Sequence, residues 1–247
     1  MSEDLSEIAT RLWDARRNGG LIATPDPGLS ERRAYEIQQA LIDARPDAPA
    51  GCKVGATGAG APAALGLGGP LAGPLWRETI LDVGESSALV PLFPAHRSQA
   101  EVEIAFHIAR TPADPSPEAV AACIGAIGLA LEFTGNRLDP MPSPVGPGFV
   151  ADHGGNGAVV LGPAGHAVAL DDLPSLTVHL DIAGAQVKSG RGDSVLGHPL
   201  NALVWLIGHL AGRGVQLQAG QVVLTGAVVP LTAGGVRGRD RRPCPRV

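Results

Sequence analysis

The sequence is poor in aromatic residues, in cysteine and in any strong excess of one charge, and these shortages limit the kind of protein that it can be. Aromatic side chains make up 3% of the 247 residues, whereas glycine and proline number 34 and 22. This composition is typical of a globular chain with many turns and with packing by small side chains. The formal net charge of −5 offers no basic surface, so we expect no nucleic-acid partner. A chain of this length forms one large domain, or one domain with a small accessory region.

The cysteines and the first residues indicate the compartment. Cys52, Cys123 and Cys244 are odd in number and lack the spacing of a metal site, so a reducing environment is the simplest interpretation. The segment 1–5 is acidic and lacks the basic-then-apolar order of a signal peptide. Because no apolar run reaches the length of a membrane span, we expect a cytoplasmic protein with no membrane partner.

Apolar periodicity predicts the order of the helices and strands. One helix is expected over about 5–18, a second follows the cap Ser30 and ends before Pro46, and a buried helix begins at Pro199. The segment 58–75 is almost uncharged and is interpreted as a covered active-site loop. Strands are predicted at 80–83, 88–92, 100–108, 126–133, 158–161 and 222–226, with a hairpin over 176–188.

Three acidic residues lie within apolar strand patterns. Side chains alternate between the two faces of a strand, so Glu101 and Glu103 share one face while Val102 points to the other. Glu132 lies near the end of a second apolar run, 126–133. One interpretation places all three acids on solvated faces, because alternating Glu is common on half-exposed strands.

A metal site is the alternative interpretation of the same acids. Unpaired buried carboxylates are costly and tend to protonate, so an acid in a run this apolar requires a cation. Three carboxylates with no nearby Cys or His suit a hard ion such as Mg²⁺ or Mn²⁺. The spacing by itself leaves both interpretations open.

Polar residues in glycine-rich segments are further candidates. Lys53, between Gly51 and Gly55, is placed to meet an anion or to take a proton, although many glycine-rich loops carry a lysine without a function. The turn that holds Asp152 and Asn156 can line a pocket or can be an ordinary Asx turn. A histidine before a helix is either a cap or a substrate contact. Our candidates for substrate binding are Arg137, Asp152, Asn156 and His198.

The order of these motifs resembles one known family. The chain is similar to the fumarylacetoacetate hydrolase superfamily, in particular to its branch of 2-keto-4-pentenoate hydratases and 4-oxalocrotonate decarboxylases. The resemblance extends over about residues 5–232. Five pieces carry it, in order: Ala34-Tyr35-Glu36-Ile37-Gln38, Gly51-Cys52-Lys53-Val54-Gly55, Ala100 to Phe106, Ala130-Leu131-Glu132, and Val195 to Leu206 together with Leu224-Thr225-Gly226-Ala227.

This resemblance implies an α+β fold. A mixed β-roll of the fumarylacetoacetate hydrolase C-terminal-domain type would carry a small helical N-terminal region, usually in a homo-oligomer. We accordingly expect an N-terminal helical region with the lysine loop at 1–75 and a β-roll catalytic domain at 76–234. The basic segment 235–247 has no apolar period and is expected to be poorly ordered.

The resemblance also implies a chemistry. The family's metal ligands fall on Glu101, Glu103 and Glu132, with Mg²⁺ or Mn²⁺ as the cofactor, and its active-site lysine falls on Lys53. The implied activity is that of a metal-dependent lyase of aromatic catabolism, a hydratase. It would add water to a small-molecule 2-hydroxy-2,4-dienoate, or to its 2-oxo tautomer, and give a 4-hydroxy-2-oxo acid.

Several departures from the family pattern keep alternatives open. Hydratases often have Pro-Asp-x-Gly after the lysine loop, where this chain has Leu71 in place of the Asp, and relatives with an apolar residue there include the decarboxylases. The helix that follows His198, with Trp205, is like the hydratase version. The turn at 151–156 differs from the family form, and a basic tail replaces the family's final strands. Decarboxylation of a 4-oxalocrotonate-like diacid, or a role as a non-catalytic partner subunit, therefore remains an alternative.

Overall fold

The computed structural model describes residues 4–26, 28–84, 86–165, 168–182 and 185–230. These residues form six α-helices with short 3-10 turns between them. None of the helices in this part of the chain is long and apolar enough to cross a membrane. The helices are α1 (Leu5–Asn18), α2 (Glu31–Ala44), α3 (Ala61–Leu65), α4 (Pro117–Cys123), α5 (Gly146–Ala151) and α6 (Pro199–Ala211).

A mixed sheet of seven strands, in the order β3-β2-β11-β5-β6-β8-β4, forms the centre of the molecule. Two small two-stranded sheets, β1-β7 and β9-β10, lie outside it. The strands are β1 (Ile22–Ala23), β2 (Gly51–Gly55), β3 (Leu71–Leu75), β4 (Ile80–Asp82), β5 (Gln99–Ile108), β6 (Ile124–Thr134), β7 (Leu138–Asp139), β8 (Asn156–Gly165), β9 (Thr177–Ile182), β10 (Ala185–Arg191) and β11 (Val222–Pro230).

Local sequence signals account for the three long helices. The Asp4 side chain caps α1, and Gly19 ends it in the left-handed conformation. Ser30 caps α2 by accepting a hydrogen bond from the Arg33 amide. Pro199 is the first residue of α6, where its missing amide proton costs nothing. All three helices lie where the sequence predicts them.

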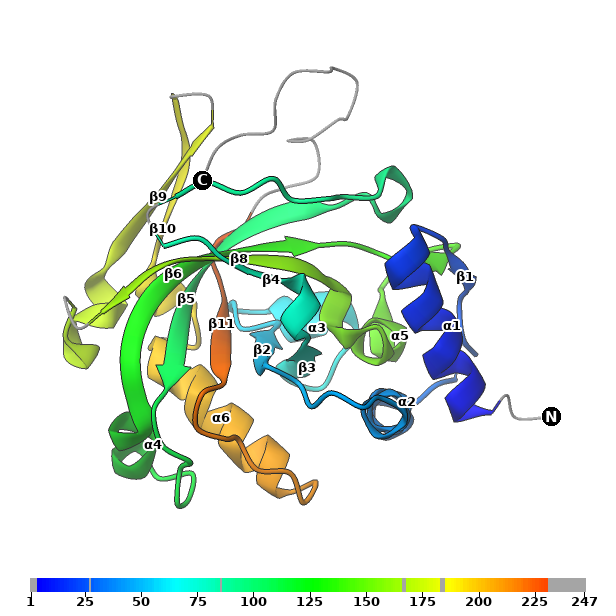
Figure 1. Ribbon diagram of the computed structural model, residues 1–247, viewed down its shortest axis with the longest axis horizontal. Coiled ribbons are helices and arrows are strands. Elements are labelled where there is room, and N and C mark those ends of the chain that lie inside the picture. The colour runs from blue at the N-terminus through cyan, green and yellow to red at the C-terminus, as the bar shows by residue number, and fades with distance from the viewer. Residues whose placement is uncertain (1–3, 27, 85, 166–167, 183–184, 231–247) are drawn as a thin grey trace.

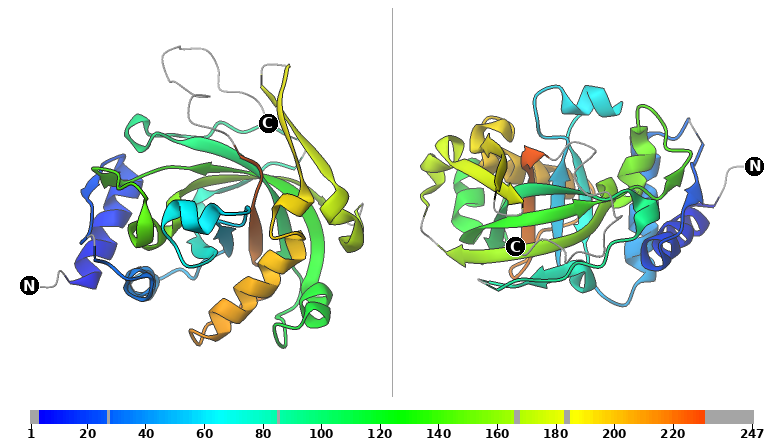
Figure 2. Two further views of the ribbon diagram at one scale, coloured as in Figure 1. Left: turned by 180° about the vertical axis from the view of Figure 1, so that it is seen from behind. Right: turned by 90° about the horizontal axis from the view of Figure 1, so that it is seen from above.

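The long strands of the sheet are curved, and helices lie on two sides of it (Figure 1). Helix α4 contacts α6, and α1 and α5 both contact α2 at the other end of the molecule. The hairpin of β9 and β10 projects beside the sheet (Figure 2). This arrangement agrees with the expected α+β roll with a helical N-terminal region.

Two faces of β5 separate two environments. Ile104 and Phe106 point to the side of α6 and belong to the same large core cluster as Leu203 of that helix. Ala105 points to the opposite, inner face and packs with Leu224 in a smaller cluster. Glu101 and Glu103 share the alternation of Ala105, so the fold turns both acids toward the inside of the roll.

An arginine between two tryptophans fixes the N-terminal helices to the sheet. The Arg45 guanidinium lies 4.0 Å from the ring centroid of Trp13 on α1 and 4.2 Å from that of Trp76, which follows β3. The two indole rings meet edge to face at 5.6 Å, and Trp76 is fully buried. Cation–π contacts of this kind stabilise by about 0.5–2 kcal/mol each, more when desolvated.

The structure differs from the sequence prediction in two segments. The segment 58–75 is not one covered loop, since it contains α3, which has no buried residue, and the fully buried strand β3. The predicted strand at 88–92 is absent from the described residues. Strands β2 and β3 lie on the N-terminal side of the boundary expected at residue 75 and pair within the central sheet, and the division into two regions stays a prediction. The segment 235–247, expected to be poorly ordered, lies outside the described residues.

Candidate metal and active site

The pairing of β5 with β6 brings the three predicted acids together. The two strands are antiparallel, with Glu101 opposite Glu132 and Glu103 opposite Ala130. One carboxylate oxygen from each of Glu101, Glu103 and Glu132 lies within 4.8 Å of those of the other two. Glu103 and Glu132 are buried and Glu101 is half-buried. We call these three residues the acidic triad.

Burial and mutual repulsion make the acidic triad unfavourable without a cation. Burial first, and then the charge of Glu132, raise the pKa of Glu103 well above its ordinary value. The same two causes, in the same order, raise the pKa of Glu101. Three converging carboxylate oxygens in such a site fit a hard divalent ion, which would relieve both effects.

In the described structure Lys53 supplies a positive charge in contact with the triad. Its Nζ lies 3.3 Å from Oε2 of Glu132, and its side chain is buried on β2. Burial acts to lower the pKa of Lys53, but the three acids, Glu132 first, oppose it and hold the pKa above its ordinary value. One ammonium group therefore faces three carboxylates, and the site keeps a negative charge that favours a bound cation.

A glycine allows the apolar residue Leu71 to pack beside Lys53. Gly154 has a φ of +61°, and a Cβ added there would lie 2.8 Å from Cε of Lys53 and still closer to Cδ1 of Leu71. Leu71 is buried at the start of β3 and is opposite Gly55 in the pairing of β3 with β2. The wall of the site next to the ammonium group is thus apolar.

Two groups hold the buried acids in place. Nδ2 of Asn156 donates to Oε1 of Glu132 at 2.8 Å, and the amide of Gly226 donates to Oε2 of Glu103 at 2.8 Å. Within the described part of the chain, Oδ1 of Asn156 is buried and has no hydrogen-bond partner. A buried acceptor without a partner next to the acidic triad is suited to a ligand or to a water molecule.

Arg137 and Asp152 form a buried ion pair behind Asn156. Nε of Arg137 donates to Oδ1 and Oδ2 of Asp152 at 2.7 and 2.8 Å, and its Nη2 donates to the Asn156 carbonyl at 3.0 Å. Both side chains are almost fully buried. This geometry orients the turn that carries Asn156.

A second arginine, which the sequence analysis missed, completes this network. Nη2 of Arg16 on α1 lies 3.6 Å from Oδ1 of Asp152, and its Nη1 donates to the Asn156 carbonyl. Burial and the neighbouring Arg137 lower the pKa of Arg16 to about 9. Arg16 follows Ile8 and Leu12 at intervals of four residues on the buried face of α1. That position on an apolar stripe is the signal that identifies it.

His198 is the predicted site residue that the structure does not join to the others. Its Nδ1 accepts the amide of Leu200, so the imidazole caps α6. In the described structure no contact connects His198 with the acidic triad, with Lys53 or with Asn156. Its contact with a substrate remains a prediction.

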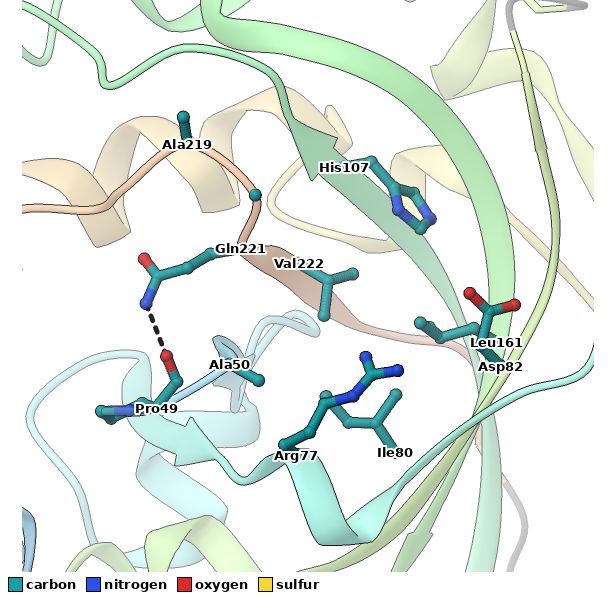
Figure 3. A pocket seen from close by; sticks show the side chains of 11 residues that line it. Pro49, Ala50, Arg77, Ile80, Asp82, His107, Leu161, Ala219, Gln221 and Val222 are labelled. Carbon is teal, nitrogen blue, oxygen red and sulfur yellow. Dashed lines mark hydrogen bonds between the residues drawn. The ribbon is translucent and has the colours of Figure 1, made fainter. Parts of the chain in front are cut away.

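A separate cavity of about 430 Å³ opens at the far end of β5 (Figure 3). Arg77, Asp82 and His107 contribute its charged or titratable lining, and none of the predicted site residues lines it. His107 is six residues beyond Glu101, which corresponds to roughly 20 Å along a strand. This cavity is therefore distinct from the acidic triad.

Two features together indicate the class of this protein. One is the curled mixed sheet, and the other is the acidic triad that its paired strands β5 and β6 hold beside a lysine. This chain belongs to the fumarylacetoacetate hydrolase family, because the model of the fumarylacetoacetate (FAA) hydrolase C-terminal region matches residues 75–244. The resemblance stated from the sequence is confirmed.

Curated relatives and solved structures lie in the expected branch. A 2-keto-4-pentenoate hydratase of Paraburkholderia phymatum is 31% identical over 244 residues, which are 94% of this chain and 91% of that protein. A 4-oxalocrotonate decarboxylase of a Pseudomonas species is 29% identical, over 93% of this chain and 90% of that protein. The solved 4-oxalocrotonate decarboxylase of Pseudomonas putida G7, complexed with magnesium and adipate, matches with a TM-score of 0.77 at 26% identity, covering 92% of this chain and 89% of that one.

Proposed function

We propose that this protein is a divalent-metal-dependent lyase that hydrates a 2-hydroxy-2,4-dienoate to a 4-hydroxy-2-oxo acid. The observation that carries the proposal is the acidic triad, in which three carboxylates lie beside the single ammonium group of Lys53. The relatives of this chain include proteins named as hydratases and decarboxylases, and a similar structure is described as a magnesium complex. Mg²⁺ or Mn²⁺ is our choice of ion because every proposed protein ligand is a carboxylate oxygen.

Glu101, Glu103 and Glu132 would hold the ion. A bound divalent ion would supply a Lewis acid for the carboxylate and the C2 oxygen of the substrate. Lys53 would deliver a proton to C5 of the dienol while the C2 hydroxyl loses its proton, which gives the 2-oxo-3-enoate. Water then adds its oxygen to C4 and a proton to C3, so that the overall change is the addition of one water molecule.

The residues around the triad would position these groups. Asn156 fixes Glu132 and keeps Oδ1 free to accept a hydrogen bond from the substrate or from the attacking water. We now assign Arg137 and Asp152 a positioning role, because each commits its charge to the other and to the turn that carries Asn156. Arg16 shares that role.

Decarboxylation is the second candidate, and Leu71 favours it. Hydration requires a group that activates water as well as a group that moves a proton to carbon, and Leu71 provides neither. If a vinylogous carboxylate left as CO₂, its bonding electrons would form the same dienolate, and one proton from Lys53 would then complete the reaction. A partner subunit without activity is the outcome if neither reaction occurs.

The test is turnover by the purified protein with Mg²⁺ or Mn²⁺. We expect loss of the diene absorbance of a 2-hydroxydienoate and formation of the 4-hydroxy-2-oxo acid, with no CO₂ released. CO₂ from a 2-oxo dienoic diacid would select the decarboxylase instead. The Lys53→Ala variant should lose turnover, whereas Glu118→Gln, which alters an exposed acid on α4, should keep it. Absence of both reactions with either metal would rule out the enzymatic proposal.

We also propose a homo-oligomer in the cytoplasm. Strand β6 lies between β5 and β8, yet its first half is only partly buried and Leu129 is 41% exposed. An apolar side chain exposed on a central strand favours contact with a second copy. Light scattering across a concentration series tests the subunit number.

A further inference from the structure

The chain contains only two lysines among its nineteen Lys and Arg residues, Lys53 and Lys188. Lys53 is buried beside the acidic triad. Lys188 lies on β10, in the hairpin that projects beside the sheet (Figure 2). Its position relative to the triad can be followed through β11.

Strand contacts connect Lys188 with Glu101 through β11. A Cβ added at Gly190 would overlap the Val228 carbonyl, so β10 passes directly against β11. Nζ of Lys188 donates to the carbonyl of Pro230, and Pro230 is opposite Glu101 in the pairing of β11 with β5. The second lysine therefore lies at the half-buried end of the triad, away from Lys53.

In the described structure the ammonium group of Lys188 meets a neutral acceptor. Within the described ranges Lys188 makes no ion pair, and its bond to a neutral carbonyl leaves two of its three N–H donors available. A partly exposed ammonium group, one strand away from the proposed metal ligand Glu101, is arranged to meet a second anionic group of a bound substrate.

We infer that Lys188 forms a subsite for the second carboxylate of a dicarboxylic ligand, one whose 2-oxo acid end lies at the acidic triad. This inference rests on the proposed function and narrows it to a substrate with two carboxylates. The acidic triad repels a free anion, so the subsite acts only on a ligand that is already held at its other end.

The subsite has a consequence for the choice of reaction. A carboxylate paired with Lys188 loses that pairing if it departs as neutral CO₂, so the pair stabilises the reactant more than the transition state. Lys188 therefore favours retention of the distal carboxylate. The subsite supports hydration of a dienoic diacid over its decarboxylation.

The test compares two ligands that differ only in the distal carboxylate. Isothermal titration of the Mg²⁺-loaded protein with 2-oxoadipate and with 2-oxohexanoate should show about five- to tenfold tighter binding of the diacid. Lys188→Met should remove this preference and leave the affinity for oxalate unchanged, and Lys188→Arg should keep most of the preference. Arg191→Met is the matched control. It removes one positive charge from the same strand of the hairpin, at an exposed residue whose side chain points to the opposite face from that of Lys188.

The outcomes separate this inference from the proposed function. Equal affinity for the two ligands in the parent protein, or a preference that survives in Lys188→Met, overturns the subsite while oxalate binding still supports the triad. A preference lost equally in Arg191→Met shows a general charge effect and also overturns the subsite. Failure of the parent protein to bind oxalate with Mg²⁺ overturns both.

Discussion

Glu103 shows how the site opposes the stability of the fold. Its carboxylate is buried against two like charges, and its pKa is raised by burial and by Glu132. A neutral amide of the same shape can still accept the hydrogen bond from the Gly226 amide. A substitution that removes the charge of Glu103 should therefore raise the free energy of unfolding and weaken ion binding.

We predict that Glu103→Gln raises stability and weakens metal binding. In EDTA its free energy of unfolding should exceed that of the parent by about 1 kcal/mol, because one buried charge is gone. Urea unfolding measures the first effect, and titration with Mn²⁺ should show at least a tenfold loss of affinity. Glu118→Gln should change neither quantity. Parental Mn²⁺ affinity in Glu103→Gln would contradict the assignment of the ligand.

Lys53→Met should separate the metal from the chemistry. The variant removes the ammonium group but none of the proposed ligands, so Mn²⁺ should still bind, with equal or higher affinity because one positive charge is lost. Turnover should fall by about 10²-fold or more, the usual effect of losing a group that transfers a proton. Titration and a diene absorbance assay measure the two effects. Loss of both together would indicate that Lys53 acts mainly on the structure of the site.

His153 makes stability depend on pH. It is buried near Arg16, Arg137 and Arg45, and burial, followed by these charges, lowers its pKa well below the ordinary value. Folded His153 stays neutral, while in the unfolded chain it takes up a proton below about pH 6.5. The contribution of His153 to the free energy of unfolding is thus fully present above that pH. It is lost as the pH falls toward the folded pKa, by up to about 1.4 kcal/mol per pH unit.

The role of His153 is tested by comparing how steeply the free energy of unfolding falls with pH in the parent and in a variant. His153→Asn keeps a residue type that tolerates the φ of +56° at this position. Between pH 7 and pH 5.5 the parent should lose about 1 kcal/mol more than the variant in urea unfolding. Parallel losses in both proteins would assign the pH dependence to other groups.

At the level of elements, Arg16 joins α1 to the turn behind the site. Its guanidinium bonds to the carbonyl of Asn156 and lies near Asp152. We expect Arg16→Met to destabilise the fold by about 2 kcal/mol, because the buried Asp152 loses one of its two arginines. Arg17→Met removes an exposed charge from the adjacent position and should cost less than about 0.5 kcal/mol. Thermal and urea unfolding of the pair measure the difference, and equal effects would contradict the role of Arg16.

The elements also show which parts of the fold the sequence can predict. The cap Ser30, and Pro199 with the apolar run that follows it in α6, act within a few residues, and both helices were predicted correctly. Strand β3 was missed because it contains Gly73 and Pro74, and a strand tolerates proline only at the edge of a sheet. That β3 is an edge strand depends on long-range pairing with β2, which no local pattern contains.

The site follows the same division between local and long-range signals. Alternation along β5 places Glu101 and Glu103 on one face, but the register that sets Glu132 opposite Glu101 is a property of the folded sheet. The family resemblance supplied that link, together with the active-site role of Lys53. Arg16 and Lys188 have no such motif. Their positions depend on the docking of α1 and of the β9–β10 hairpin against the rest of the molecule.

For the whole molecule, the exposed part of β6 predicts self-association. Leu129 faces the same side of the sheet as Ile104, yet it is 41% exposed. If a second copy covers this surface, Leu129→Glu should shift the mass in light scattering toward the monomer, and Val187→Glu, at an exposed position on the hairpin, should not. A parent protein that is monomeric throughout a micromolar series would contradict the prediction.

The position of Arg45 between Trp13 and Trp76 gives the protein an internal optical reporter. Two of its three tryptophans share one guanidinium contact, and they come from different parts of the chain, one from α1 and one from the end of β3. Separation of the N-terminal helices from the sheet would expose both indoles to water together. Their fluorescence emission would then move to longer wavelength, and the docking of this region could be followed in real time without an added dye.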